Sequence, residues 1–469
     1  MIKLIKNYYV VFIAILLIII NQALLGIDKN GRAVYPEFLS MADRLLAGET
    51  LYSNVFAGEY FLQSIYFPGI PYLIAFIKSL LNFNDGATLI LLSIISFFSI
   101  YFSLLKLSIK FGCGLGQSLL ALTIAFGLFF DFFFFYLTEG KSDALMISTA
   151  ILAYFLLNDI LLNKDSRVIK AMFLLFVFIF LGLLKQQSIA IFAGIFIFLL
   201  ADKSFSIRLR MTMAGNMMAA SVIVAIIILS HNNAYFMTVE AVHMKEFNPV
   251  FDNAKLFYYE LKNSWFYISV VVSSIWINYK KIMLNTYFKM WFIVSICFLA
   301  ISILSFLRYG GNEANLQTGF ILFMPFFVLL INDIMDKSAN NKKVIYSILF
   351  FVIIKNLMSA VDHYYDYLLN DINNHAVQEY LGENYRGANV LFSAPDYFTL
   401  KASGLNPVYV YETYSRVENF FESDYLPINN NVDLIIGNFP LFDYKNFKLD
   451  ESINIPKLLK NRIYTRNTT

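Results

Sequence analysis

Apolar segments, most of them of about twenty residues, recur along most of the chain, and a segment of that length can cross the hydrocarbon core of a bilayer as one helix. They occupy residues 8–27, 87–109, 117–138, 144–162, 213–231, 265–279, 288–307, 317–333 and 343–359. Of the 469 residues, 58% are hydrophobic and only 15% are charged, a composition unlike that of soluble domains. The sequence therefore predicts a polytopic protein whose constant partner is the lipid bilayer.

The apolar stretch 171–201 is too long for one membrane helix, and a polar run that begins at Lys185 interrupts it. Basic residues flank the stretch near Lys170 and Lys203, and the positive-inside rule assigns both flanks to the cytoplasm. Both flanks can lie there only if the chain crosses the membrane and returns, turning at Lys185. This gives about eleven spans, and we expect a plasma (inner) membrane protein with a cytoplasmic N-terminus and an extracytoplasmic C-terminus.

The last hundred residues differ in character from the rest of the chain. From residue 361 to 469, polar and apolar residues mix, and short runs typical of strands occur at 389–394, 407–412 and 432–438. We expect a small extracytoplasmic α/β domain with a short parallel sheet, for acceptor recognition, for capping a cavity or for packing alone. The predicted fold class is thus an all-α membrane domain, residues 1–360, followed by this α/β domain.

A long first loop, residues 28–86, follows the first span and should lie outside the cell. Within it, Pro36 and Gly48 are typical of the start and the stop of a helix, and the apolar residues between them recur at helical spacing. Such a helix lies on the membrane surface rather than across it. A second apolar segment at 65–81, which contains two prolines, predicts another interfacial or re-entrant helix.

Several features near the N-terminus carry a family resemblance. Asp28 follows the first span, "LLAGETLY" ends the surface helix, "YFPGIPY" follows, and Asp143 comes after the third span. This order resembles the GT-C superfamily of membrane glycosyltransferases, which includes the protein O-mannosyltransferases and the aminoarabinose transferases of lipid A. The resemblance covers roughly residues 1–200, and it implies transfer of a sugar from a polyprenyl-phosphate donor to an extracytoplasmic glycan, lipid or protein acceptor.

The resemblance also implies roles for the acids. Asp28 matches the first-loop acid that acts as the base, and Asp143 matches the second-loop acid that supports it. The distance from Asp28 to Gly48 is longer than in the family pattern, so Glu37 is a second candidate for the base. From the residues alone, Asp28 is equally well explained as an acid at a membrane exit, and Asp143 as a cap for the next helix.

Two cations stand at the outer ends of spans, where the positive-inside rule disfavours them. Lys185 and Arg308 are therefore candidate contacts for the donor phosphate, although snorkelling to lipid headgroups would also account for them. The turn "RYGGNEANLQ" at 308–317 carries polar side chains suited to sugar hydroxyls. The candidates for sugar or acceptor binding are Glu139, Asn312, Glu313 and Asn315.

Other classes of function find less support. The net charge of +3 gives no basic surface for nucleic acid, and two cysteines and four scattered histidines have no metal-ligand spacing. We therefore expect no metal and no other cofactor, with a divalent cation held by the carboxylates as the alternative. Two alternatives stay open: a transporter or flippase for lipid-linked glycans, which would place charges near mid-membrane in both halves, and an O-antigen-type polymerase or ligase, with its long loop late in the chain.

Overall fold

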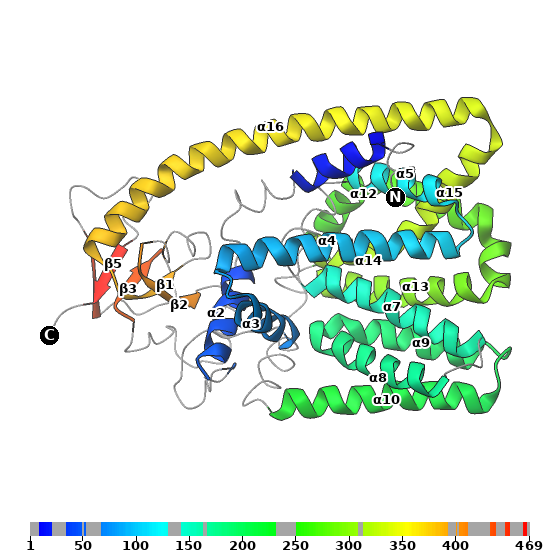
Figure 1. Ribbon diagram of the computed structural model, residues 1–469, viewed down its shortest axis with the longest axis horizontal. Helices are drawn as coiled ribbons and strands as arrows, with labels where there is room; N and C mark the ends of the chain where they lie inside the picture. The colour runs from blue at the N-terminus through cyan, green and yellow to red at the C-terminus, as the bar shows by residue number, and fades with distance from the viewer. Residues whose placement is uncertain are drawn as a thin grey trace. The chain divides into compact units, whose positions relative to one another are not determined.

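The structure is a computed structural model of the whole chain. It describes residues 9–20, 34–48, 51–52, 67–129, 142–162, 167–230, 250–307, 313–392, 400, 403–410, 432–437, 446–450 and 463–466. The chain divides into two compact units (Figure 1). Unit 1 comprises Met1–Ala23, Leu89–Ile226 and Lys245–Val361, and unit 2 comprises Leu24–Thr88, Ile227–Met244 and Asp362–Thr469.

Unit 1 is built from helices. Its described elements are a helix over residues 9–20, α4 (Asp85–Lys110, which begins in unit 2), α5 (Leu115–Leu128), α7 (Ser142–Leu162), α8 (Arg167–Leu184), the short 3₁₀ helix η2 (Gln186–Ser188), α9 (Ile189–Ala201), α10 (Ile207–Ser230), α12 (Val250–Leu284), α13 (Thr286–Leu307), α14 (Glu313–Ile321), α15 (Met324–Lys337) and the first part of α16 (Ala339–Asn384). α9 packs against α13, α13 against α14, and α7 against α8.

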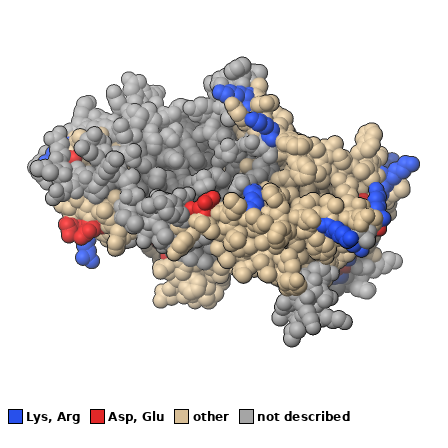
Figure 2. Space-filling view, turned by 90° about the horizontal axis from the view of Figure 1, so that it is seen from above, with Lys and Arg blue, Asp and Glu red and all other residues tan. Residues whose placement is uncertain are grey.

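Within the described residues, five helices are long and apolar enough to cross a membrane: Leu91–Lys110, Ser142–Leu162, Ile207–Ser230, Thr286–Leu307 and Asn340–Asp362. Only 28% of the window in Asn340–Asp362 is buried inside the protein, so most of its apolar surface must meet lipid rather than a core. Most of the described surface in Figure 2 likewise carries neither basic nor acidic side chains. The protein is therefore a multi-pass membrane protein.

The predicted turn at Lys185 is confirmed. α8 ends at Leu184, Lys185 has extended backbone, and η2 leads directly into α9. At 1.5 Å per residue, the 13 residues of α9 span about 20 Å, which is less than the hydrocarbon thickness of about 30 Å.

The predicted single span at 317–333 is wrong, because the helix breaks at Leu322 and Phe323 into α14 and α15. Pro325 stands in the first turn of α15, where it has no N–H to continue the hydrogen-bond ladder of α14. Side chains of α12 and α13 satisfy carbonyls around the break: Tyr267 donates to Phe320 (2.7 Å), Ser274 to Phe326 (2.5 Å), and Trp291 and Ser295 to Leu322 (2.9 and 3.3 Å). Such partners are what make a break tolerable at membrane depth.

Other predicted spans differ in length. α12 (Val250–Leu284, 35 residues) extends beyond the predicted span 265–279 at both ends. α16 (Ala339–Asn384, 46 residues) likewise extends beyond the predicted span 343–359. Between residue 359 and the end of α16, the sequence contains no proline and a single glycine, at Gly382, so the helix continues into polar sequence. α5 ends at Leu128, and residues 130–138 of the predicted span 117–138 lie outside the described residues.

The described helices of the first loop belong to unit 2. α2 (Val34–Leu46) and α3 (Gly69–Leu81) confirm the two predicted helices, and Gly48 has the positive φ, 75°, expected of a helix stop. The ammonium of Lys78 on α3 joins them, because it pairs with Asp43 of α2 and with Asp85 at the start of α4 (2.6 Å). The two carboxylates explain how a lysine is tolerated in this apolar helix.

Unit 2 also contains a small sheet with the strand order β2-β1-β3-β5-β4. The strands are β1 (Asn389–Phe392), β2 (Asn406–Val410), β3 (Leu434–Ile436), β4 (Phe447–Leu449) and β5 (Ile463–Arg466). β1 pairs in parallel with β2 and with β3, as predicted. β5 pairs antiparallel with β3 and with β4, so the expectation of a purely parallel sheet is wrong. The division of the chain at residue 360 into two domains stays a prediction.

Candidate functional site

Two of the residues singled out in the sequence, Asp143 and Lys185, contact each other inside unit 1. The ammonium of Lys185 lies 2.7 Å from Oδ1 of Asp143, and the hydroxyl of Thr318 donates to the same oxygen at 2.9 Å. The Asp143 side chain is 3% exposed and that of Lys185 11%. The three residues come from α7, from the turn before η2 and from α14, and we call them the Asp143 cluster.

Local sequence explains how each group reaches this point. Asp143 lies in the first turn of α7, where its negative charge meets the positive end of the helix dipole. Lys185 occupies the tight link between two helices that run in opposite directions. Thr318 lies near the middle of α14 and is completely buried.

α13 supports two sides of the Asp143 cluster through close glycine contacts. A methyl group on Gly194 of α9 would lie 2.7 Å from Cα of Val294, and one on Gly319 of α14 would lie 2.9 Å from Cβ of Ser302. Both distances are shorter than ordinary contacts, so only glycine lets these helices approach α13 so closely. The helix that follows Lys185 and the helix that carries Thr318 are thus both set by packing on α13.

The ammonium of Lys185 can donate more hydrogen bonds than the described residues accept from it. An ammonium has three N–H donors, and among the described residues only Asp143 accepts a hydrogen bond from Lys185. Oδ1 of Asp143 accepts two hydrogen bonds, one from the ammonium of Lys185 and one from the hydroxyl of Thr318. Asp143 is therefore suited to holding Lys185 in place, and less suited to removing a proton. The described residues thus leave the ammonium hydrogen-bonding capacity for a further acceptor such as a phosphate oxygen.

The structure does not describe the side chains of the other predicted site residues. Glu37 lies on α2 in unit 2, and Glu313 and Asn315 lie in the first turn of α14, with side chains outside the described set. Asp28, Glu139, Arg308 and Asn312 lie outside the described residues altogether. The roles of these residues thus stay predictions.

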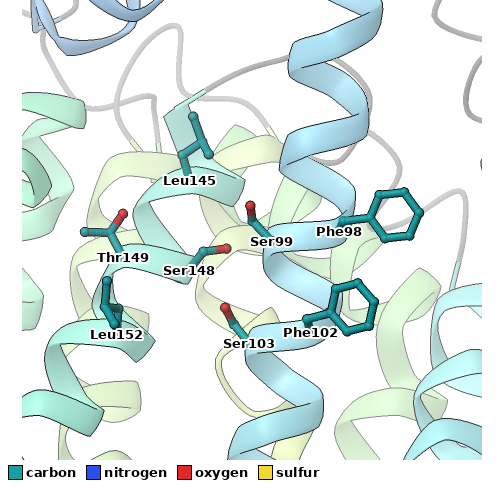
Figure 3. A pocket seen from close by; sticks show the side chains of 8 residues that line it. All are labelled: Phe98, Ser99, Phe102, Ser103, Leu145, Ser148, Thr149 and Leu152. Atoms are coloured by element: carbon teal, nitrogen blue, oxygen red, sulfur yellow. The ribbon is translucent and has the colours of Figure 1, made fainter. Parts of the chain in front are cut away.

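A groove of about 470 Å³ lies between α4 and α7 (Figure 3). It is lined by Phe98, Ser99, Phe102, Ser103, Leu145, Ser148, Thr149 and Leu152. Its residues on α7 are spaced three or four apart and so share one face of the helix. At about 100° per residue, Asp143 points roughly 160° away from that face. The groove is therefore on the opposite side of α7 from the Asp143 cluster and does not form part of it.

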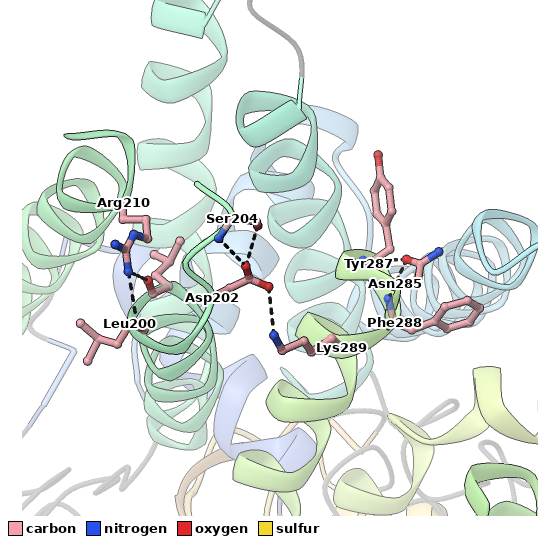
Figure 4. A network of polar contacts seen from close by, with 9 residues as sticks. Leu200, Asp202, Ser204, Arg210, Asn285, Tyr287, Phe288 and Lys289 are labelled. Carbon is pink, nitrogen blue, oxygen red and sulfur yellow. Dashed lines mark hydrogen bonds and ion pairs between the residues drawn. The ribbon is translucent and has the colours of Figure 1, made fainter. Parts of the chain in front are cut away.

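A second polar network lies at the far end of α9, about 20 Å along the helix from Lys185 (Figure 4). Asp202 accepts from the backbone and hydroxyl of Ser204 and pairs with Lys289 of α13 at 3.1 Å. Burial raises the pKa of Asp202, but the hydrogen bonds from Ser204 and Lys289 outweigh it, so that the pKa falls below 3.8. Arg210 donates to the carbonyls of Leu199 and Leu200 at the end of α9. The network thus links the end of α9 to α10 and α13, and Asp202 and Lys289 balance each other's charge.

Sequence reasoning missed Thr318 and Lys355. Thr318 lies at the start of the predicted span 317–333, where an uncharged hydroxyl does not indicate a functional residue. Lys355, on α16, donates to the carbonyl of Leu128 at the end of α5. As an ionisable residue within a predicted span it is a functional candidate by default, and that signal was present in the sequence. Among the described residues, no group of three His, Cys, Asp or Glu side chains could hold a metal ion.

The chain was compared with known proteins. No family model and no curated protein matches its sequence. Among solved structures, ArnT from Cupriavidus metallidurans bound to undecaprenyl phosphate is similar with a TM-score of 0.59 and 8% identity, covering 98% of both chains. ArnT in the apo state is similar with a TM-score of 0.53 and 11% sequence identity, covering 84% of both chains. The apo oligosaccharyltransferase of Archaeoglobus fulgidus has a TM-score of 0.49 and 9% sequence identity, covering 92% of this chain and 70% of the oligosaccharyltransferase.

At such low identity the likeness concerns the fold, and it extends over nearly the whole chain. In its fold, this chain is therefore similar to ArnT.

Proposed function

We propose that the protein is a membrane glycosyltransferase that moves a sugar from a polyprenyl-phosphate donor to an extracytoplasmic glycan, lipid or protein acceptor. The observation that carries the proposal is the ammonium of Lys185, buried in the helical unit against Asp143 with hydrogen-bonding capacity to spare. The likeness in fold to ArnT, which was solved with undecaprenyl phosphate bound, supports the same choice of ligand.

Lys185 has the role of phosphate contact. A phosphate group brings several acceptor oxygens and negative charge to an ammonium that has a single described acceptor. Asp143 and Thr318 hold the lysine in position before the donor arrives, so that little order has to be created on binding. Arg308 is the second proposed phosphate contact, since its planar guanidinium matches two phosphate oxygens at once.

The base is a different carboxylate. Asp143 is bonded to a cation and to a hydroxyl, so we assign the base to Asp28, with Glu37 as the second candidate. The base takes the proton of the acceptor hydroxyl, whose oxygen forms a bond to the anomeric carbon. The bond from that carbon to the phosphate oxygen breaks, and the phosphate leaves with the electron pair. Lys185 stabilises the charge that develops on it, so no metal is needed in this scheme.

This reaction takes place on the extracytoplasmic face in our proposal. The basic flanks near Lys170 and Lys203 assign the opposite end of the 171–201 helix pair to the cytoplasm. Glu139 and the polar side chains at 312–315 are proposed to bind the sugar or the acceptor. The C-terminal sheet would lie on the same side and contribute to acceptor recognition.

The test uses purified protein in nanodiscs with undecaprenyl phosphate linked to radiolabelled glucose, mannose, N-acetylglucosamine or aminoarabinose. We expect transfer of one of these sugars to a membrane acceptor extract. Asp28→Asn should abolish transfer without weakening donor binding. Lys185→Met should weaken binding of undecaprenyl phosphate itself, while Lys289→Met, which alters an ion pair at the other end of α9, should leave binding unchanged.

Clear outcomes would contradict the proposal. Equal binding of undecaprenyl phosphate by Lys185→Met and Lys289→Met would remove Lys185 from the site. Loss of transfer in Glu37→Gln but not in Asp28→Asn would move the base to Glu37. Movement of the intact lipid-linked sugar across the membrane, without transfer, would instead identify a flippase.

A further inference from the structure

Gln317, on α14, has a side-chain oxygen that the described protein leaves without a partner. The residue is 5% exposed, and its Oε1 makes no hydrogen bond to any described group. Buried amide oxygens in folded proteins nearly always have a partner, because taking them out of water without one is costly. An oxygen of this kind indicates that something absent from the free chain completes it, such as an ordered water or a ligand.

The position of Gln317 points to the ligand. The next residue is Thr318, whose hydroxyl bonds to the carboxylate that holds Lys185. Consecutive Cα atoms are about 3.8 Å apart, so the Gln317 backbone lies close beside the Asp143 cluster. In a polyprenyl-phosphate donor the sugar is bonded directly to the phosphate. A phosphate held by Lys185 would therefore bring the hydroxyls of its sugar within reach of α14.

The chemistry of the amide fits a sugar. Its oxygen accepts a hydrogen bond from a hydroxyl, and its nitrogen can donate to another. A cation would suit a second phosphate contact, and a carboxylate would repel the phosphate next to it, but a neutral amide does neither. A site that hydrogen-bonds one substrate hydroxyl rejects analogues that lack it, because its own buried group is then left unpaired.

We infer that Gln317 accepts a hydrogen bond from a hydroxyl of the donor's sugar and so contributes to the choice of sugar. The inference rests on the proposed function and deepens it. Gln317 contributes to recognition of the sugar and not of the carrier, whereas Lys185 contributes to recognition of the phosphate, which every donor shares.

The test is Gln317→Met, which keeps the length of the side chain and removes its amide. Binding is measured with undecaprenyl phosphate and with the undecaprenyl phosphate–sugar that the wild type binds most tightly. We expect unchanged affinity for the sugar-free lipid and about a tenfold loss for the sugar-linked one. Because the variant also removes an unpaired buried oxygen, its melting temperature should be equal to or above that of the wild type. Gln317→Glu, which keeps an acceptor oxygen, should retain most of the preference for the sugar-linked lipid but bind both lipids more weakly, because its carboxylate repels the phosphate.

Gln117→Met is the matched control, since Gln117 bonds to Asp336 elsewhere in unit 1. It should bind both lipids as the wild type does. If Gln317→Met binds the sugar-linked lipid as tightly as the wild type, the inference is overturned, while the proposed function stands. If the wild type binds neither lipid, the proposed function is contradicted, and the inference that rests on it is overturned as well. If both lipids bind Gln317→Met equally weakly, Gln317 acts on the phosphate or on folding, and the inference is again overturned.

Discussion

The contact between α9 and α13 allows a quantitative test of how the Asp143 cluster is held. A methyl group on Gly194 would lie 2.7 Å from Cα of Val294 and 3.3 Å from its backbone nitrogen. Ordinary contacts begin near 3.4 Å, so in Gly194→Ala the two helices must move apart by about 0.7 Å at this point. A gap of that size forfeits roughly a quarter to a half of the dispersion energy of the atoms that faced each other.

Gly215 provides the matched control. It also lies inside a helix, α10, but a methyl group there meets nothing within 4 Å. Gly215→Ala should therefore gain only the better helix propensity of alanine, about 0.5–1 kcal/mol. Gly194→Ala gains the same amount but pays an overpacking cost of about 1–3 kcal/mol, so it should be less stable than the control by that amount.

Thermal unfolding in detergent measures the difference. A chain of this size shifts its melting temperature by about 1–2 °C per kcal/mol, so Gly194→Ala should melt about 1–6 °C below Gly215→Ala. Since α9 follows directly from Lys185, the same variant should also bind undecaprenyl phosphate more weakly than Gly215→Ala does. Equal melting temperatures for the two variants would refute the close approach of α9 to α13 and, with it, our account of how the cluster is positioned.

Three further predictions address charge and burial. Lys185→Met leaves Asp143 buried without its counter-charge and should destabilise the protein by about 3–5 kcal/mol; adding Asp143→Leu should recover part of this loss in the same unfolding assay. The pKa of Asp202 is lowered in the folded state, so the stability that it contributes is present above about pH 3.8 and disappears as the pH falls further. The difference in melting temperature between wild type and Asp202→Asn should therefore shrink on acidification, and a constant difference would contradict the shift. Burial raises the pKa of Cys113 to about 12, so a maleimide at neutral pH should label it only after unfolding, as mass spectrometry can check.

The helical hairpin at Lys185 was predictable because the apolar stretch 171–201 is too long for one membrane helix and a charged residue interrupts it near its middle. Both residues of the ion pair were predicted as site residues. Asp143 was selected because it follows the third span, and Lys185 because it is a cation at the outer end of a span, where the positive-inside rule disfavours it. Their pairing was not predictable, since 42 residues separate them and periodicity carries no information on contacts between helices. Thr318 was missed for the same reason.

The errors arose where distant parts of the chain decide the local structure. Pro325 is a local signal for the break at Leu322 and Phe323, but the carbonyls around the break are satisfied from α12 and α13. β4 and β5 have three and four residues, too few for a visible alternation, and they form by pairing with each other and with β3. Tertiary contacts of this kind override local pattern.

The broken helix also has a consequence for how the chain enters the membrane during translation. α14 has 9 residues and α15 has 14, so neither alone matches the hydrophobic length that an insertion machinery releases readily into lipid. The side chains that complete the break belong to helices synthesised earlier. We therefore expect sequential assembly, in which α12 and α13 enter the membrane first and α14 and α15 then pack against them. Deletion of α12 or of α13 should prevent insertion of the α14–α15 segment or lead to its degradation.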